Sequence, residues 1–244
     1  MNAPVSSPSF QPLYQQIKSL IVQRLIAGEW TPGLVIPSEM DLAARFGVSQ
    51  GTVRKAVDEL AAENILIRRQ GKGTYVATHD EERVKLRFLR LVAADGSKEF
   101  LDNALLSCER AKAPAPVARM LGLRTGSAVI SIKRLLLFSG KPLILDHVIL
   151  PAATFKSVTA DKINQFNGSL YRMYETQLGI RMVRAEERLT AVGADAEAAE
   201  QLRLQAGTPL LRIERVSFTY GDKPMEWRLG LCLTDDHHYL NHLE

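Results

Sequence analysis

Residues 36–77 read IPSEMDLAARFGVSQGTVRKAVDELAAENILIRRQGKGTYVA, and this stretch decides the fold of the N-terminal part of the chain. Ser38 precedes an apolar run and has Asp41 three positions later, which is the spacing of a helix N-cap and its returning partner. A glycine breaks this short helix after Phe46, and Ser49 offers the cap of the next helix. Two consecutive helices, each opened by a serine, predict a helix-turn-helix.

The flanking segments complete this unit. Upstream, apolar residues at helical spacing predict a first helix over residues 10–28. Downstream, two β-rich runs meet at a turn that contains Gly71 and Gly73, which predicts a hairpin. Three helices and a hairpin make a winged helix, and we place this domain at residues 1–78. The polar stretch that follows predicts a linker over residues 79–84.

The composition excludes several classes of protein. The chain has 244 residues, 46% hydrophobic content and a formal net charge of +4, so it can bury one or two cores and has no strongly basic tail. No apolar run is long enough to span a membrane, and the first residues lack the pattern of a signal peptide. Cys108 and Cys232 form no C-x-x-C motif. We therefore expect a cytoplasmic protein with reduced thiols and no membrane partner.

Residues 85–244 contain an internal duplication and are expected to form a second domain. Six residues recur 81 positions later, and each copy has the pattern of a short helix, a long strand and a returning strand. The class predicted for the whole chain is α+β, with the second domain a mixed antiparallel sheet covered by helices. The six residues are Leu121, Gly126, Ile130, Ile132, Arg134 and Gly140, which recur as Leu202, Gly207, Leu211, Ile213, Arg215 and Gly221.

The polar face of the third helix suits the major groove of DNA. Gln50 matches adenine and Arg54 matches guanine, each through two hydrogen bonds. Serine caps leave backbone N–H groups at helix starts for phosphate oxygens. A solvated face with ion pairs within the helix is the alternative reading of the same charges. The residues that we predict to contact DNA are Ser38, Ser49, Gln50, Gly51, Thr52, Arg54, Lys55 and, on the wing, Lys72.

The quoted stretch resembles the DNA-binding domain of the GntR family of bacterial transcriptional regulators, over nearly all of residues 10–77. The motifs are P-S-E, L-A, F-G-V-S, T-V-R, A-V-x-x-L and R-R-Q-G-x-G-T-x-V. The resemblance implies operator contacts near P-S-E, at the start of the recognition helix and at the glycine of the wing. These are Ser38, Ser49, Thr52, Arg54 and Gly73.

Two residues depart from the family pattern. The family often has Arg where this chain has Met40, and Arg where it has Gln50. Both positions commonly meet DNA in the family. We therefore expect an operator that differs from the usual one, with an adenine in place of a guanine opposite Gln50.

Two arginines of the second domain are expected to point inward. Period-two alternation puts Arg134 in phase with apolar neighbours, and Arg215 repeats this in the second copy. The guanidinium fork matches carboxylates and phosphates, so a bound anion is a suitable partner. An internal salt bridge to Asp146, Glu186 or Glu226 is the alternative, and the residues alone leave both open.

A helix start offers a second place for an anion. Ser169 and Tyr171 open a helix expected over residues 168–177, where free N–H groups and the helix dipole favour negative charge. Simple capping by Ser169 is the alternative.

The second domain resembles the UTRA ligand-binding domain of the HutC-type branch of the family, which is similar in fold to chorismate lyase. The markers are LGLRTG, IKRLLLFSGKPLILDHVILP, GSLYRMYETQLGI and RIERVSFTYGDKPMEW. The resemblance implies that Arg134, Ser169 and Tyr171 hold the anionic end of a metabolite, and that Asp146 and Glu226 hold its polar end. Members that sense phosphosugars tend to show R-x-R, but here the second position is Leu136, which favours a less charged effector.

The resemblances imply a metabolite-responsive repressor. We expect a homodimer in the bacterial nucleoid that binds a palindromic double-stranded operator and responds to a small anionic effector. An enzyme of chorismate lyase-like fold with a DNA-binding appendage is the alternative, although no catalytic constellation and no cofactor motif stands out. The run Asp235–His238 is expected to be a solvated loop, because adjacent strand residues point apart and cannot converge on one metal ion.

Overall fold

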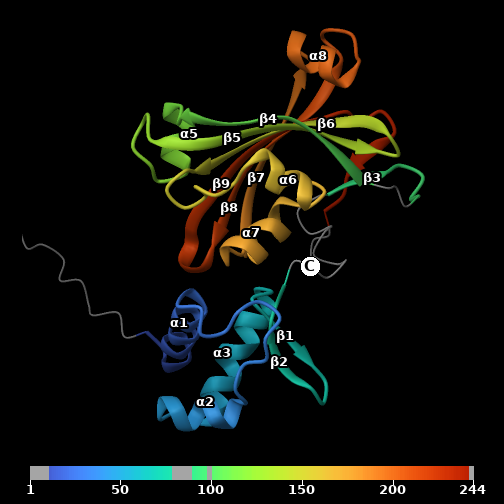
Figure 1. The fold of residues 1–244 in the computed structure, drawn as a ribbon. Coiled ribbons are helices and arrows are strands. Elements are labelled where there is room, and N and C mark those ends of the chain that lie inside the picture. Colours follow the sequence, from blue (N-terminus) through green and yellow to red (C-terminus); the bar gives the residue numbers. More distant parts are fainter. Residues whose placement is uncertain (1–10, 79–89, 98–100, 242–244) are drawn as a thin grey trace, which may run out of the picture. The chain divides into compact units, whose positions relative to one another are not determined.

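The computed structural model describes residues 11–78, 90–97 and 101–241 (Figure 1). The chain divides into two compact units, Met1–Ala77 and Thr78–Glu244. The predicted linker, residues 79–84, lies outside the described residues.

The first unit is a winged helix, as the capping pattern predicted. Its elements are α1 Leu13–Ile26, α2 Glu39–Phe46, α3 Gln50–Ala62, β1 Leu66–Arg69 and β2 Gly73–Val76. The backbone N–H of Asp41 donates to Ser38 Oγ at 3.2 Å, and the N–H of Ser38 donates to Asp41 Oδ2 at 3.3 Å, which closes the predicted capping box. Gly47 then ends α2 with a φ of 66°, a conformation that favours glycine.

The apolar faces of these helices form the core of the first unit. Ile17 and Ile21 of α1 are buried, and so are Val53 and Leu60 of α3. The wing pairs β1 with β2 in antiparallel register, and Val35 adds an isolated bridge to β2. Because α3 buries one face in this core, its opposite face is left for solvent.

The second unit is built on a six-stranded sheet in the order β4-β5-β6-β9-β8-β7, with every pairing antiparallel. Each half of the duplication gives a short helix and a hairpin, so the predicted repeat is confirmed. The returning strands β6 and β9 pair at the sheet centre. The strands are β4 Leu101–Lys112, β5 Ala128–Phe138, β6 Lys141–Pro151, β7 Arg184–Gly193, β8 Pro209–Thr219 and β9 Lys223–Cys232.

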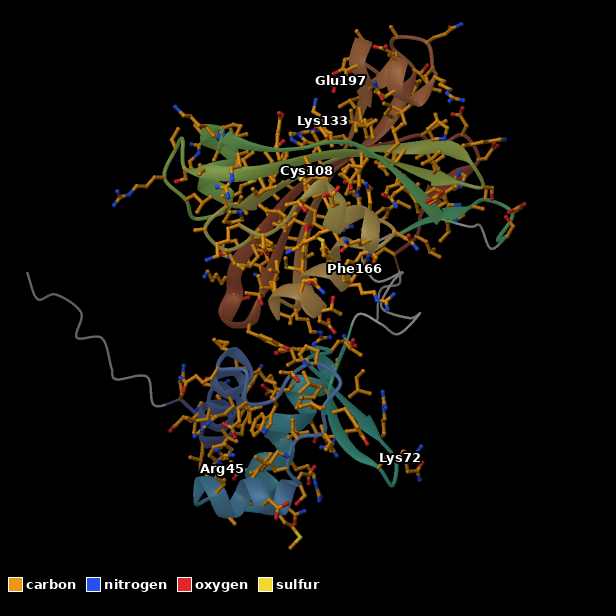
Figure 2. All side chains as sticks on the ribbon, viewed as in Figure 1. Arg45, Lys72, Cys108, Lys133, Phe166 and Glu197 are labelled. Carbon is orange, nitrogen blue, oxygen red and sulfur yellow. The ribbon has the colours of Figure 1, made fainter. Side chains whose placement is uncertain are left out.

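Helices cover both faces of this sheet (Figure 1). On one face α6 Ala160–Gln165 and α7 Leu170–Leu178 pack over β5 and β6 in a core that includes Ile132 and Phe155. On the other face lie α5 Ala115–Met120 and α8 Ala196–Leu202, the two repeat helices. The ion pair between Lys133 and Glu197 ties the sheet to α8 (Figure 2).

A two-stranded ribbon corrects one prediction. The expected solvated loop at the C-terminus instead contains β10 His237–Tyr239, which pairs with β3 Leu91–Ala93. The His237 ring is partly buried and lies 5.5 Å from the Phe138 ring, edge to face. The ribbon covers a separate apolar cluster that contains Leu136 and Ile144. The expectation is confirmed for Asp235 and Asp236, which are exposed at a bend, but it was wrong for His237 and His238, because strand pairing with a distant segment leaves no local signal.

Candidate nucleic-acid interface and buried polar cluster

The polar face of α3 is on the surface of its unit. Gln50, Gly51, Arg54 and Lys55 are exposed and Thr52 is half-buried, so the residues predicted to meet base edges are accessible. The alternative reading expected Arg54 to pair within α3. Instead, Arg54 Nε donates to Glu39 of α2 at 2.9 Å.

The serine hydroxyls at the two helix starts are exposed and already bonded. Ser38 Oγ donates to Asp41 Oδ2 at 2.6 Å. Ser49 Oγ accepts the backbone N–H of Thr52 at 3.2 Å and lies 2.9 Å from Thr52 Oγ1. Capping therefore holds both serines in place at the accessible ends of α2 and α3.

The wing presents Lys72 at its tip (Figure 2). Gly73 has a φ of +101°, and a Cβ added there would lie 3.2 Å from Val35 Cγ2, so a side chain would strain the turn. Lys55 is directed elsewhere, because its Nζ lies 3.9 Å from the centre of the Tyr14 ring of α1. Lys55, one of the residues predicted to contact DNA, therefore packs on an aromatic ring of its own unit in this structure.

Sequence reasoning missed Glu39 of α2 as a site residue. Its carboxylate accepts hydrogen bonds from Arg54 at 2.9 Å and from Arg68 Nη2 at 2.8 Å, and a longer one from Gln50 Nε2 at 3.5 Å. Arg68 also pairs with Asp58 at 2.7 Å. The acidic residue after the P-S of the motif was the available signal.

The second unit holds a cluster of buried charges on the face of the sheet that α6 and α7 cover. Strand register places Arg134 of β5 opposite Asp146 of β6, and Asp146 opposite Gly230 of β9. A Cβ added at Gly230 would meet only Ile144 and Cys232 of its own sheet, at 3.4 Å and 3.6 Å. Along this row two charged side chains, Arg134 and Asp146, are thus followed by a position without a side chain, Gly230.

Arg134 has internal partners. Its Nε donates to Asp146 Oδ2 at 2.8 Å, and its Nη1 donates to the carbonyl oxygen of Gly168. The salt bridge considered for Arg134 is therefore present. Gly168 has a φ of +69°, and a Cβ there would lie 2.0 Å from Asn103 Cγ, so this position requires glycine.

Arg215 pairs with a residue that the sequence analysis did not consider. Its Nε donates to Glu187 Oε1 at 2.6 Å, and the two residues are register partners on β8 and β7. The expected candidates were Asp146, Glu186 and Glu226. The predicted pairing of Arg215 with Glu186 was wrong, because the side chain of Glu186 points to the opposite face of β7 from that of Glu187.

Glu226 is fully buried and accepts several hydrogen bonds. The hydroxyl of Tyr171 donates to its Oε1 at 2.8 Å, and the hydroxyl of Tyr174 donates to its Oε2 at 3.2 Å. Tyr171 Oη also lies 2.9 Å from Ser217 Oγ. Burial, together with the charge of Glu226, raises the pKa of both tyrosines, so they remain donors at neutral pH.

Arg228, another residue that sequence reasoning missed, links the two halves of the cluster. Its Nη2 donates to Glu226 Oε2 at 3.2 Å, and its Nε lies 3.7 Å from Asp146 Oδ1. Burial lowers the pKa of Arg228, but these two carboxylates outweigh burial and hold that pKa well above its usual value. Burial likewise raises the pKa of Asp146, while Arg228 and Arg134 pull it below its ordinary value.

Ser169 stands at the N-cap position of α7 and is half-buried, but its side chain makes no capping hydrogen bond. Five residues were predicted for the effector site, and four of them form two pairs: Arg134 with Asp146, and Tyr171 with Glu226. Arg228 joins these pairs, and Ser169 follows the glycine whose carbonyl holds Arg134. Within the described residues, no group of three or more His, Cys, Asp or Glu side chains is arranged to hold a metal ion, and no helix is long and apolar enough to cross a membrane.

Comparisons with known proteins match both units. The family model for the bacterial regulatory proteins of the gntR family matches residues 13–76, and the UTRA domain model matches residues 101–238. The HTH-type regulator YurK of Bacillus subtilis is 29% identical over 238 residues, which is 95% of each chain. The transcriptional repressor NagR of the same species is 26% identical and covers 100% of this chain and 99% of its own.

Two further relatives extend the match. The regulator Rv0792c of Mycobacterium tuberculosis is 31% identical and covers 91% of this chain and 80% of its own. A ligand-binding domain from Bordetella bronchiseptica, assigned to a GntR-family regulator, is 42% identical with a TM-score of 0.63, and the alignment covers 65% of this chain and 98% of that one. The chain therefore belongs to the GntR family of bacterial transcriptional regulators and carries a UTRA domain as its C-terminal unit.

Proposed function

We propose that this chain is a DNA-binding transcriptional repressor whose operator binding is controlled by a small anionic metabolite in the UTRA domain. The observation that carries the proposal is the exposed face of α3, where Gln50 and Arg54 stand in the position of a recognition helix. Ser38, Ser49, Gly51, Thr52 and Gly73 would add phosphate and backbone contacts, with Lys72 supplying charge from the wing. A homodimer would place two such heads on a palindromic operator.

The buried cluster is the proposed effector site. Arg134, Ser169 and Tyr171 would hold the anionic end of the effector, and Asp146 and Glu226 its polar end. The arginines of the cluster balance its carboxylates, because Arg134, Arg215 and Arg228 face Asp146, Glu187 and Glu226. A strongly charged ligand would upset this balance in a low-dielectric site, which supports a monoanion or a zwitterion over a phosphosugar.

Contacts continue from this cluster toward the start of the UTRA domain. Glu187, the partner of Arg215, also accepts the hydroxyl of Tyr239 on β10. β10 pairs with β3, the first strand described after the predicted linker. An effector that shifts the cluster would thus act on a strand close in sequence to the linker. Weakening operator binding a hundredfold requires about 2.7 kcal/mol of coupling.

The test of DNA binding uses the full chain and a library of randomised duplexes. We expect enrichment of an inverted repeat, with fluorescence anisotropy giving a specific affinity that is lost at high salt. No enriched sequence would overturn the proposal.

The test of effector control titrates that complex with a panel of small carboxylic acids, amino acids and sugar phosphates. We expect a monoanion or zwitterion to release the duplex. Arg134→Ala and the milder Tyr171→Phe should abolish release without changing the enriched sequence, and the exposed Arg124→Ala should behave as the wild type. Release that survives both cluster variants would place the effector elsewhere.

A further inference from the structure

The carboxylate of Glu39 lies where the first turn of α2 meets α3 and the wing. One oxygen accepts Arg54 Nε of α3 at 2.9 Å, and the other accepts Arg68 Nη2 of β1 at 2.8 Å. The Glu39 side chain is only 16% exposed, whereas that of Arg54 is 57% exposed. A single carboxylate therefore joins three elements of the winged helix.

An acidic group on this face requires an explanation, because it opposes the approach of phosphate. The positive end of α2 favours an acidic residue, but Asp41 already serves the capping box. A side chain needed only for the dipole would extend into solvent rather than hold two arginines. The position of Glu39 thus points to a role that involves Arg54.

The geometry of the guanidinium shows what that role is. Bidentate reading of guanine O6 and N7 uses two N–H groups on one edge of the group. Glu39 accepts Arg54 through Nε, which leaves the two terminal nitrogens as the edge that remains for a base. Because the bond also limits the rotation of a long side chain, less conformational entropy is lost when Arg54 meets a base.

We propose that Glu39 is a positioning residue that fixes Arg54 for the reading of one guanine in each half-site, and so sets operator specificity at that base pair. The inference rests on the proposed DNA-binding function. Arg68, held between Glu39 and Asp58, acts as the brace that keeps the carboxylate in place rather than as a reader of DNA.

The chain offers a matched control for the loss of a carboxylate. Glu59 lies on α3 of the same unit and pairs with Lys18 at 3.2 Å. Glu39→Gln and Glu59→Gln make the same change in charge and shape, but only the first alters the contacts of Arg54. A difference between them therefore isolates the positioning role from net charge.

The experiment measures sequence discrimination with full-length protein. Wild type, Glu39→Gln and Glu59→Gln are each selected against randomised duplexes, and the affinity for the enriched duplex is compared with duplexes in which one guanine is replaced. We expect wild type and Glu59→Gln to prefer guanine at one position by about tenfold or more. Glu39→Gln should lose most of that preference while keeping its non-specific affinity and its melting temperature.

A double-mutant cycle tests whether the effect passes through Arg54. Arg54→Lys should lose the same base preference, and adding Glu39→Gln to it should change little more. If Glu39→Gln lowers the melting temperature, Arg68→Gln serves as the second variant, because it removes the brace from the carboxylate and keeps both members of the Glu39–Arg54 pair. The base preference should then fall part of the way, and a full preference in Arg68→Gln would contradict the positioning role.

Two results separate the possible failures. If Glu39→Gln keeps the full base preference while Arg54→Lys loses it, Glu39 does not position Arg54 and the inference is wrong. If the wild type enriches no sequence at all, the proposed function itself fails and takes this inference with it.

Discussion

The polar face of α3, taken with the neighbouring Glu39 and Arg68, and the charged face of the UTRA sheet both pair arginines with carboxylates, but they use these groups in opposite ways. On α3 the charges are exposed, and their bonds are made within a small unit at the surface. In the sheet, Asp146 and Glu226 are buried, with partners on other strands and on α7. Exposed pairs contribute little to folding, while removing one member of a buried pair is costly. Substitutions on the first face should therefore cost little stability, whereas removing one charge from the second face should cost several times more.

The largest expected effect tests the buried side of this comparison. Glu226→Ala removes the carboxylate that accepts hydrogen bonds from Tyr171, Tyr174 and Arg228, and we expect it to reduce the free energy of unfolding of the UTRA domain by about 3–5 kcal/mol. Urea unfolding followed by the fluorescence of Trp227, in a Trp30→Phe background, measures this domain. Glu200→Ala, which alters an exposed carboxylate, serves as the control. Equal stability of the two variants would contradict the account of the cluster.

The next effect tests the exposed side. Arg54→Ala should cost about 1–3 kcal/mol of specific DNA binding and relax the sequence preference, with no change in melting temperature. Lys72→Ala should weaken binding equally for all duplexes and reduce the slope of log affinity against log salt by about 1. Anisotropy titrations at several salt concentrations separate the two. A loss of sequence preference in Lys72→Ala would show that the wing reads bases.

A smaller effect compares two serines at helix starts. Ser38→Ala removes a capping box and should cost about 1 kcal/mol of unfolding free energy. Ser169 makes no capping bond, so Ser169→Ala should leave the stability of its domain unchanged. Chemical denaturation of both variants tests the contrast, and similar losses would mean that Ser169 caps α7 after all.

The smallest effect is a dependence on pH. Burial and the nearby charge of Lys133 lower the pKa of His147 below its ordinary value of 6.5, although Asp146 and Glu197 oppose this. Neutral His147 therefore contributes stability above pH 6.5 that is lost as the pH falls toward its folded pKa. The unfolding free energy of the UTRA domain should drop between pH 7.5 and 5.5, and His147→Gln should reduce the drop. An unchanged profile in that variant would assign the pH dependence to other groups.

The winged helix could be predicted well from the sequence because its signals are local. Ser38, Asp41 and Gly47 act within one turn of helix, and the apolar spacing of α3 alone shows which face is buried. The role of Glu39 escaped the same reasoning because its partners are 15 and 29 residues away. Sequence spacing predicts which residues share a helix face, but not which side chains meet between elements.

The charged cluster was predicted in composition but not in pairing. The alternation of β5 and β8 showed that Arg134 and Arg215 point inward, and both are buried. The partner of Arg215 depended on the register of β7, which no local signal gives. Arg228 had a signal that was not used. After Gly221 the second copy has one inserted residue, so Lys141-Pro142 recur as Lys223-Pro224, 82 positions later, and the same offset matches Arg228 to Asp146.

That correspondence has a consequence for the pattern of charge across the sheet. In the first repeat the facing pair is Arg134 and Asp146, and in the second it is Arg215 and Arg228, so the two halves of the duplication carry opposite charges at one matched position. Because β6 and β9 pair at the sheet centre, these unlike positions lie on neighbouring strands. The repeat therefore builds an asymmetric row of buried charges, in which the carboxylate of Asp146 from one half lies 3.7 Å from the guanidinium of Arg228 from the other.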